Sequence, residues 1–186
     1  MVTKRVSRTS KTELGVFKIH TDSHEPMWAT TGSACFDLKA YLPVGCPVSV
    51  YTSDNMNEQR DSRELTAYDN SGVLINPWDR VLIPTGLIFN IPDNHSIRVH
   101  PRSGLSFKSG ISLSNCEGVI DSDYVNELYI SVINLSRRRV FIGNGERIAQ
   151  AELIHGLASD KIQINNLEVA PEQKTTRSGG FGHSGK

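Results

Sequence analysis

Apolar residues recur at every second position in several segments, and this spacing most constrains the fold. Leu128, Ile130 and Val132 follow it, as do Ile97 and Val99. Because successive side chains of a strand point to opposite faces, the spacing predicts strands that bury one face. On the same grounds we predict further strands at residues 81–83, 87–91, 140–142, 148–154 and 162–167.

Turn residues separate these segments, as in Pro84-Thr85-Gly86 and Gly143-Asn144-Gly145. Proline, glycine and asparagine favour tight turns. Many short strands joined by such turns predict an all-β sandwich or barrel. A long helical stripe is absent, and only PRSGLSFKSG, from residue 101, is expected to hold a short helical turn.

The stretch from Gly45 to Trp78 is polar and charged, with few residues suited to a core. We interpret residues 45–75 as an insertion on a surface loop, with a short helix near Asn57 to Leu65. Extra surface segments often carry binding functions, so a protein partner is expected here if the chain has one. The expected organisation is an extension at 1–12, a β domain at 13–169 and a C-terminal arm at 170–186.

Charge and cysteine content argue against several classes of protein. The chain has 20 basic residues (lysine and arginine) and 20 acidic residues (aspartate and glutamate). The resulting net charge of zero argues against a protein that binds polymeric nucleic acid. Neither a membrane span nor a secretory signal is evident, so no membrane partner is expected. Cys35, Cys46 and Cys116 lack metal-site spacing, which predicts reduced, mostly buried thiols in a cytoplasmic protein. The basic N-terminal segment is also compatible with an organelle transit peptide, and the sequence does not separate a cellular from a viral protein.

The segment RSGGFGHSGK at residues 177–186 combines features of a nucleotide flap. Arg177 offers donors for phosphate oxygens, and Phe181 can stack on a base. The glycines allow close approach of the backbone. The alternative interpretation is a disordered tail with an incidental phenylalanine.

Three more segments carry candidate chemistry. Asp121 precedes an alternating strand, where it can act as a general base or merely shape a turn. Arg102, Ser103 and Gly104 are parts of a phosphate cradle, or of a turn with surface charge. Asp37 lies between two apolar residues and needs a partner, either an arginine such as Arg102 or a magnesium-bound water.

Five segments in order resemble the five motifs of the trimeric dUTP pyrophosphatase (dUTPase) family: ATTGSACFDLKA, PRSGLSFK, GVIDSDY, GERIAQ and RSGGFGHSG. The resemblance runs from residue 29 to 185, apart from the polar segment. It implies a distorted jelly roll or β-barrel that assembles as a homotrimer with shared active sites. The C-terminal arm of one subunit would close a site built by others. The implied reaction is hydrolysis of dUTP to dUMP and pyrophosphate with Mg²⁺, which limits uracil in DNA and supplies dUMP for dTTP synthesis.

The resemblance also implies roles for particular residues. Asp121 would activate the water that attacks the α-phosphorus. Mg²⁺ would be held by substrate phosphates and water, with Asp37 ordering a bound water or an arginine. The implied phosphate-binding residues are Arg102, Ser103, Gly104, Gln150, Arg177, His183 and Ser184. The implied uracil and deoxyribose site consists of Asn115, Val119, Ile120, Tyr124, Tyr129, Phe181 and Gly182.

The chain departs from the family pattern at three places in these motifs. Before the acid of the first motif it has Ala34-Cys35, where the family usually has Ala-Gly. Asn126 stands where the family has glycine, and asparagine tolerates the left-handed conformation. Either Arg177 or Thr176 fills the position of the arm arginine.

Two other functions remain as alternatives. A dCTP deaminase shares this fold but would need a glutamate base, and the matching pocket here carries Asp121. The polar segment at 45–75 favours a nucleotide-gated regulatory or binding protein on the same fold.

Overall fold

The computed structural model describes residues 11–65, 70–156 and 161–174. It confirms the all-β prediction, because these residues form fifteen strands and one short helix, α1 (Ser103–Ser109). The chain divides into two units, residues 1–156 and 157–186, and the strands and the helix belong to the first. No described helix is long and apolar enough to cross a membrane.

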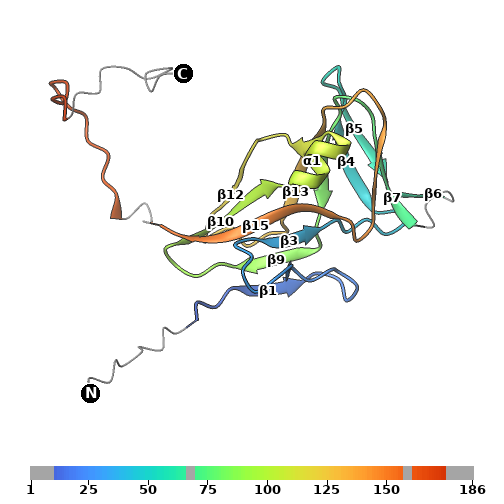
Figure 1. Cartoon of the computed structure of the whole chain (residues 1–186), viewed down its shortest axis with the longest axis horizontal. Coiled ribbons are helices and arrows are strands. Elements are labelled where there is room, and N and C mark those ends of the chain that lie inside the picture. The colour runs from blue at the N-terminus through green and yellow to red at the C-terminus, as the bar shows by residue number, and fades with distance from the viewer. Residues whose placement is uncertain (1–10, 66–69, 157–160, 175–186) are drawn as a thin grey trace. The chain divides into compact units, whose positions relative to one another are not determined.

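One five-stranded sheet carries the segments with candidate chemistry (Figure 1). Its order is β12 (Gly118–Ile120), β10 (His95–Pro101), β15 (Arg147–His155), β3 (Phe36–Lys39) and β2 (Met27–Trp28). All neighbouring pairs are antiparallel. The long strands β10 and β15 pair from His95↔His155 to Pro101↔Ala149 and form its centre.

A second antiparallel five-stranded sheet has the order β11 (Ile111–Leu113), β13 (Tyr129–Asn134), β8 (Arg80–Pro84), β4 (Pro47–Tyr51) and β5 (Asn57–Asp61). A smaller sheet has the order β14 (Val140–Gly143), β7 (Asn70–Ile75) and β6 (Arg63–Leu65). Strand β1 (Gly15–Lys18) pairs with β9 (Leu87–Asn90). These sheets fit a jelly-roll type of fold, and the described strands form no closed barrel.

The core draws on inward-facing residues of both large sheets. Ile97 and Val99 of β10 are buried, as are Ile130 and Val132 of β13. Each fully buried aliphatic side chain contributes about 1.5–3 kcal/mol to stability. The period-two spacing of apolar residues therefore predicted β10 and β13 correctly, because these apolar residues face the interior.

The helix predicted near Asn57 to Leu65 is wrong. Those residues form β5 and β6, and β5 pairs along its whole length with β4. The segment is also not a plain loop, because its strands β4 and β7 bury Val48, Val50, Val73 and Ile75. Backbone hydrogen bonds to β4 stabilise β5 as a strand although its residues are polar, and residue composition does not reveal such pairing.

Two further predictions are corrected. The strand predicted at 162–167 is absent, because Ile162, Ile164 and Leu167 are exposed and pair with no described strand. A strand needs a neighbour for its backbone groups. The three cysteines are free, as predicted, but they are not mostly buried: Cys116 is exposed and the other two are half-buried.

Gly72 in β7 should tolerate no side chain. A Cβ there would meet the backbone oxygen of Ile142 in β14 and lie 2.6 Å from Cζ of Phe141. We expect Gly72→Ala to lower the free energy of unfolding by about 2 kcal/mol, because β14 would have to move away. Urea unfolding measures this. Gly32→Ala, where a Cβ meets nothing within 4 Å, is the control. Equal stability of the two variants would contradict the prediction.

Candidate functional site

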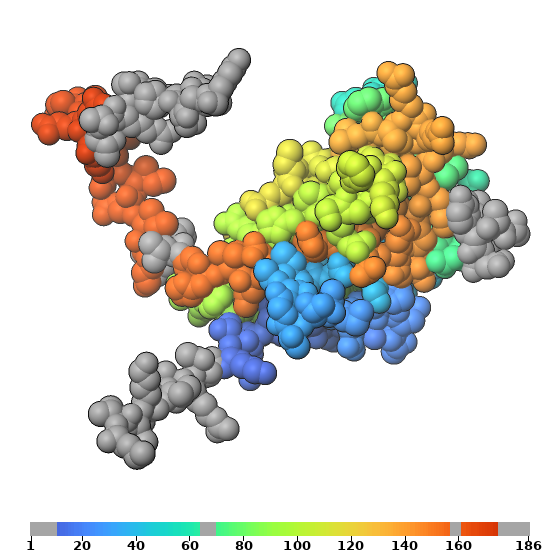
Figure 2. Space-filling view, viewed as in Figure 1, coloured from blue at the N-terminus to red at the C-terminus, as the bar shows by residue number. Residues whose placement is uncertain are grey.

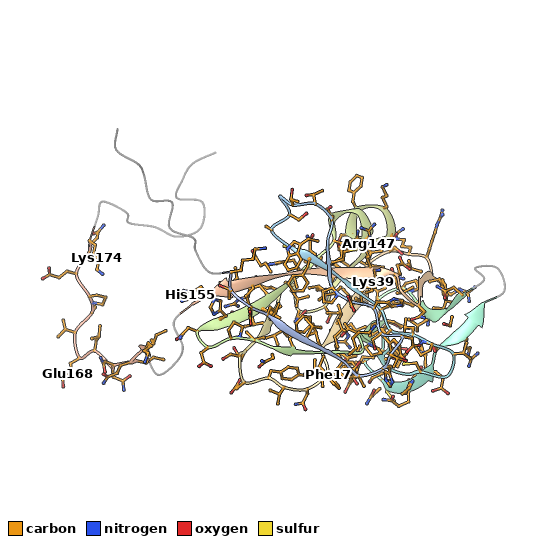
Figure 3. The ribbon with its side chains drawn as sticks, turned by 90° about the horizontal axis from the view of Figure 1, so that it is seen from below. Phe17, Lys39, Arg147, His155, Glu168 and Lys174 are labelled. Atoms are coloured by element: carbon orange, nitrogen blue, oxygen red, sulfur yellow. The ribbon has the colours of Figure 1, made fainter. Side chains whose placement is uncertain are left out.

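An ion-pair cluster forms where β10 ends and α1 begins. The Nε group of Arg102 donates to Oδ1 of Asp37 over 3.0 Å, and the Nη1 group of Arg147 donates to Oδ2 over 3.0 Å. The predicted pairing of Asp37 with an arginine is thus confirmed. Strands β3 and β15 bring the groups together: Arg147 pairs in register with Lys39, two residues after Asp37 in β3, and Figure 3 shows Arg147 and Lys39 on these neighbouring strands.

The cluster holds the Arg102 guanidinium in one orientation. Its Nη1 group also donates to the backbone oxygen of Arg147 over 3.0 Å. The Asp37 side chain is only 10% exposed, so its pairing takes place largely away from water. The Nη2 group of Arg102 has no hydrogen-bond partner among the described residues. That group is available to an anion.

Other predicted phosphate-binding residues lie at this same end of β10. Gln150 donates through Nε2 to the backbone oxygen of Pro101 over 3.1 Å. Ser103 and Gly104 begin α1 and are exposed, and no side chain caps this helix terminus. A Cβ on Gly104 would meet nothing within 4 Å, so space remains in front of its backbone. Uncapped N–H groups at a helix start can bind phosphate oxygens.

Helix α1 lies on the surface beside the turn between β13 and β14 (Figure 2). Both elements line one shallow hollow, which includes Phe107, Lys108, Arg138 and Arg139. Arg137, Arg138 and Arg139 of this turn are exposed to solvent.

A cavity of about 210 Å³ lies between the β11–β12 segment and β13. It brings together four residues predicted for the uracil and deoxyribose site: Asn115, Val119, Ile120 and Tyr129. Its other lining residues were not predicted: Leu82, Val99, Leu113, Gly118, Ile130 and Ser131. Leu82, Val99, Leu113 and Ile130 belong to apolar strand patterns, and the fold brings residues of both large sheets to one cavity.

Gly118 keeps this cavity open. A Cβ on Gly118 would lie 3.1 Å from Cβ of Val99 and 3.9 Å from Nδ2 of Asn115. Both of those residues line the cavity. The one sequence signal for this role is a glycine at the start of an apolar strand, since glycine in a strand often marks close approach of another group.

Tyr124 and Tyr129 are both linked to Glu127. The hydroxyl of Tyr124 donates to the backbone oxygen of Glu127 over 2.8 Å. A hydrogen bond to the Glu127 side chain, followed by burial, raises the pKa of Tyr129 to about 12. Tyr129 lines the cavity and Tyr124 lies outside its lining, and both side chains are exposed.

Asp121 directly follows β12 and is exposed. Its backbone oxygen accepts from the N–H of Tyr124 over 3.2 Å, so it also shapes a turn. Asn126, in the same segment, does not adopt the left-handed conformation. Cys116, in the turn between β11 and β12, does adopt it, with φ 64°. Asn126 therefore occupies the position where the family has glycine without needing a positive φ.

The register of β10 separates Asp121 from the phosphate-binding end. Ile120, the neighbour of Asp121, pairs with Ile97, and Arg102 lies five residues further along the chain. At about 3.3 Å per residue the two groups are roughly 15–20 Å apart. One chain therefore presents the cavity and Asp121 at one place and the ion-pair cluster at another.

The remaining predicted residues lie outside the described part of the chain: Thr176, Arg177, Phe181, Gly182, His183 and Ser184. Among the described residues, no group of three or more histidine, cysteine, aspartate or glutamate side chains is placed to hold a metal. Asp37 instead has both oxygens engaged by arginines.

Comparison with known proteins finds one family. The family model described as dUTPase matches residues 65–185. Deoxyuridine 5'-triphosphate nucleotidohydrolases of Finegoldia magna and Desulfotalea psychrophila are 45% and 43% identical over 123 and 160 residues. These matches cover 66% and 86% of this chain, and 82% and 86% of the relatives.

Solved structures share the fold. The dUTPase from Streptococcus mutans has a TM-score of 0.57 and 23% identity, covering 77% of this chain and 97% of that one. The dUTPase of Staphylococcus bacteriophage 80alpha with dUPNHPP has a TM-score of 0.61 and 18% identity, covering 95% of this chain and 100% of that one. At these identities the structures bear on the fold alone.

Removing the Asp37 charge should destabilise the protein. We expect Asp37→Asn to lower the free energy of unfolding by about 3 kcal/mol, because two neighbouring arginines lose their common partner. Denaturant unfolding measures the change. Glu58→Gln is the control, since Glu58 pairs with Arg60 over 2.7 Å but is exposed, and it should cost less than about 1 kcal/mol. A smaller loss for Asp37→Asn than for the control would contradict this account.

Proposed function

The chain belongs to the dUTPase family, and we propose that it hydrolyses dUTP to dUMP and pyrophosphate in active sites shared between copies of the chain. The observation that carries the proposal is the division of site residues along β10. The cavity and Asp121 are suited to a nucleoside and an attacking water. The Arg102 cluster is suited to a phosphate chain.

The base-binding end is the cavity between β11, β12 and β13. Apolar walls such as Val99 and Ile130 suit a planar base, and Asn115 offers an amide donor and acceptor to its polar edge. Rejection of other bases follows because a mismatched edge leaves polar groups unpaired. Tyr124 and Tyr129 pack around the deoxyribose, where a 2′-hydroxyl would clash.

Asp121 takes a proton from water as that water attacks the α-phosphorus. An exposed carboxylate on a turn next to the cavity can reach solvent and the first phosphate together. The new bond joins the water oxygen to the α-phosphorus, and the bond to the bridging oxygen of pyrophosphate breaks. Charge grows on the phosphate oxygens, so donors must already be in place.

Arg102, Ser103, the N–H of Gly104 and Gln150 are those donors. The ion pair with Asp37 and the hydrogen bond to the backbone oxygen of Arg147 hold the Arg102 guanidinium, so it loses little freedom when phosphate binds. These donors include no carboxylate, and Asp37 is engaged with arginines, which fits Mg²⁺ held by the phosphates and water. Mg²⁺ bound there neutralises charge on the triphosphate.

One chain keeps its two half-sites apart, so a complete site needs a neighbour. A homotrimer supplies this when the cavity of one copy faces the Arg102 cluster of the next. The arm of a further copy closes the site, with Phe181 and Gly182 on the base. Arg177, His183 and Ser184 hold the outer phosphates, with Thr176 as the alternative for the arginine position.

This activity limits uracil in DNA and supplies dUMP for dTTP synthesis. Three free cysteines fit a cytoplasmic location. A partner at residues 45–75 stays a prediction, and β5 is the part of that segment with mostly exposed side chains.

Incubation with each deoxynucleoside triphosphate and Mg²⁺ tests the reaction. We expect pyrophosphate from dUTP alone, and ammonia from dCTP would instead identify a deaminase.

Asp121→Asn tests the catalytic assignment in the same assay. We expect turnover of dUTP to fall at least about a thousandfold, because the amide cannot accept the proton. Binding of a non-hydrolysable dUTP analogue should stay within about threefold of wild type, measured by calorimetry. Asp123→Asn, two residues away, is the control and should keep most activity. Turnover by Asp121→Asn at the wild-type rate would exclude it as the base.

A further inference from the structure

An exposed aromatic ring and three cations surround the hollow at the end of α1. Phe107 is 92% exposed, and it lines this hollow of about 410 Å³ together with Lys108, Arg138 and Arg139. None of the three cations forms an ion pair with a residue that the structure describes. The described part of the chain therefore leaves their charge available to an anionic partner.

Trp78 lies at the same end of the second large sheet. Its N–H donates to the backbone oxygen of Asn134 over 2.7 Å, and the N–H of the next residue, Leu135, donates to the backbone oxygen of Gly110 over 2.8 Å. Gly110 lines the hollow, so the hollow and the Trp78 turn flank residues 134 and 135. Trp78 and Leu135 are about half exposed. Three large apolar side chains, those of Trp78, Phe107 and Leu135, are thus open to solvent at one end of this sheet.

Trp78 takes a backbone conformation that is unusual for tryptophan. Its φ is 67°, in the left-handed region where a bulky side chain is strained. The next residue, Asp79, is buried and fixes the turn: its carboxylate accepts from the N–H of Ser53 over 3.2 Å and from Nη1 of Arg60 over 3.1 Å. Both partners belong to the polar segment at 45–75, which therefore supports this turn. Strained conformations that the surroundings enforce are concentrated at functional sites.

The turn that carries the arginines is also fixed. Asn134 is fully buried, and its Nδ2 group donates to the backbone oxygen of Arg138 over 2.7 Å. Its Oδ1 accepts from the N–H of Ser136 over 3.0 Å. A Cβ on Gly110 would lie 2.9 Å from Cβ of Ser136, so the end of α1 packs closely on this turn. A partner that binds here has little backbone to order, and this favours affinity.

We propose that Trp78, Phe107, Leu135, Arg138 and Arg139 (the Trp78 surface) dock an acidic segment of another protein, which places an apolar side chain in the hollow. Tryptophan and arginine are enriched among the residues that dominate protein interfaces. Unpaired arginines select a partner of opposite charge. The surface is separate from the proposed catalytic residues, so binding and dUTP hydrolysis can be measured independently.

A peptide fits this surface better than a strand of nucleic acid does. Leu135 offers an aliphatic contact, whereas single strands are bound by aromatic rings on which bases stack. The cations are confined to α1 and one turn, and the chain has no net charge, whereas proteins that bind nucleic acid carry a basic excess.

Three probes test the proposal on the full-length chain: an acidic peptide with two central leucines, the same peptide with serines in their place, and single-stranded oligothymidylate. Trp28→Phe leaves Trp78 as the only tryptophan, so its fluorescence reports binding. We expect the leucine peptide to bind at least about tenfold more tightly than the serine peptide, because leucine side chains are buried in the complex. Oligothymidylate should bind no more tightly than the serine peptide.

Two variants should weaken binding of the leucine peptide at least about tenfold in calorimetry: Trp78→Gly, which removes an anchor, and Arg138→Glu, which reverses a charge. Both should keep wild-type dUTP hydrolysis. Trp78→Gly should also keep close to wild-type stability in urea, because glycine tolerates the left-handed conformation. Arg63→Glu changes an exposed arginine of β6 outside the hollow and is the control for charge.

Equal binding of the leucine and serine peptides, or wild-type affinity in Trp78→Gly and Arg138→Glu, would overturn the proposal. So would no binding of the leucine peptide at about 1 mM. Tighter binding of oligothymidylate would identify a nucleic-acid surface instead. Association of oligomers that ultracentrifugation detects in wild type and not in Trp78→Gly would make a second copy of the chain the occupant, and would overturn the proposal equally.

Discussion

The antiparallel pairing of β10 with β12 on one side and β15 on the other is the constraint on which the site depends. Pairing with β12 places Ile120 opposite Ile97, with Asp121 just beyond. Pairing with β15 places Gln150 opposite His100, close to Arg102 and Asp37. The same strand therefore builds two half-sites and keeps Asp121 roughly 15–20 Å from Arg102. A hydrolase that needs both must combine copies of the chain.

Sequence reasoning was sufficient for the parts of the site that sit in local motifs. An acid between Phe36 and Leu38 had to be paired, and the arginine after β10 does pair with it. Four of the predicted base-site residues line one cavity: Asn115 from the β11–β12 turn, Val119 and Ile120 from β12, and Tyr129 from β13. Gly118 and Glu127 were not predicted, because their roles depend on contacts with residues distant in the chain: Val99 for Gly118 and Gly86 for Glu127. Composition does not reveal which strands pair, nor a hydrogen bond such as that between Gly86 and Glu127, which are 41 positions apart in the chain.

The errors in the fold have the same origin. Residues 57–65 were polar enough to suggest an inserted helix, yet pairing with β4 and β7 makes them strands. Residues 162–167 carry the period-two pattern but no described strand pairs with them, so the pattern alone does not make a strand. Apolar alternation reports which side chains suit burial, and it does not report whether a neighbour is present.

Mixing two inactive variants tests the shared site most directly. Asp121→Asn lacks the proposed base, and Arg102→Gln lacks a phosphate donor. Coexpression of the two should yield oligomers in which some sites combine an intact cavity from one copy with an intact Arg102 cluster from another. The account predicts a clear return of dUTP hydrolysis in the purified mixture, and none when the double variant replaces either partner. Activity that stays at the level of the single variants would show that each chain forms its own complete site and would contradict the account.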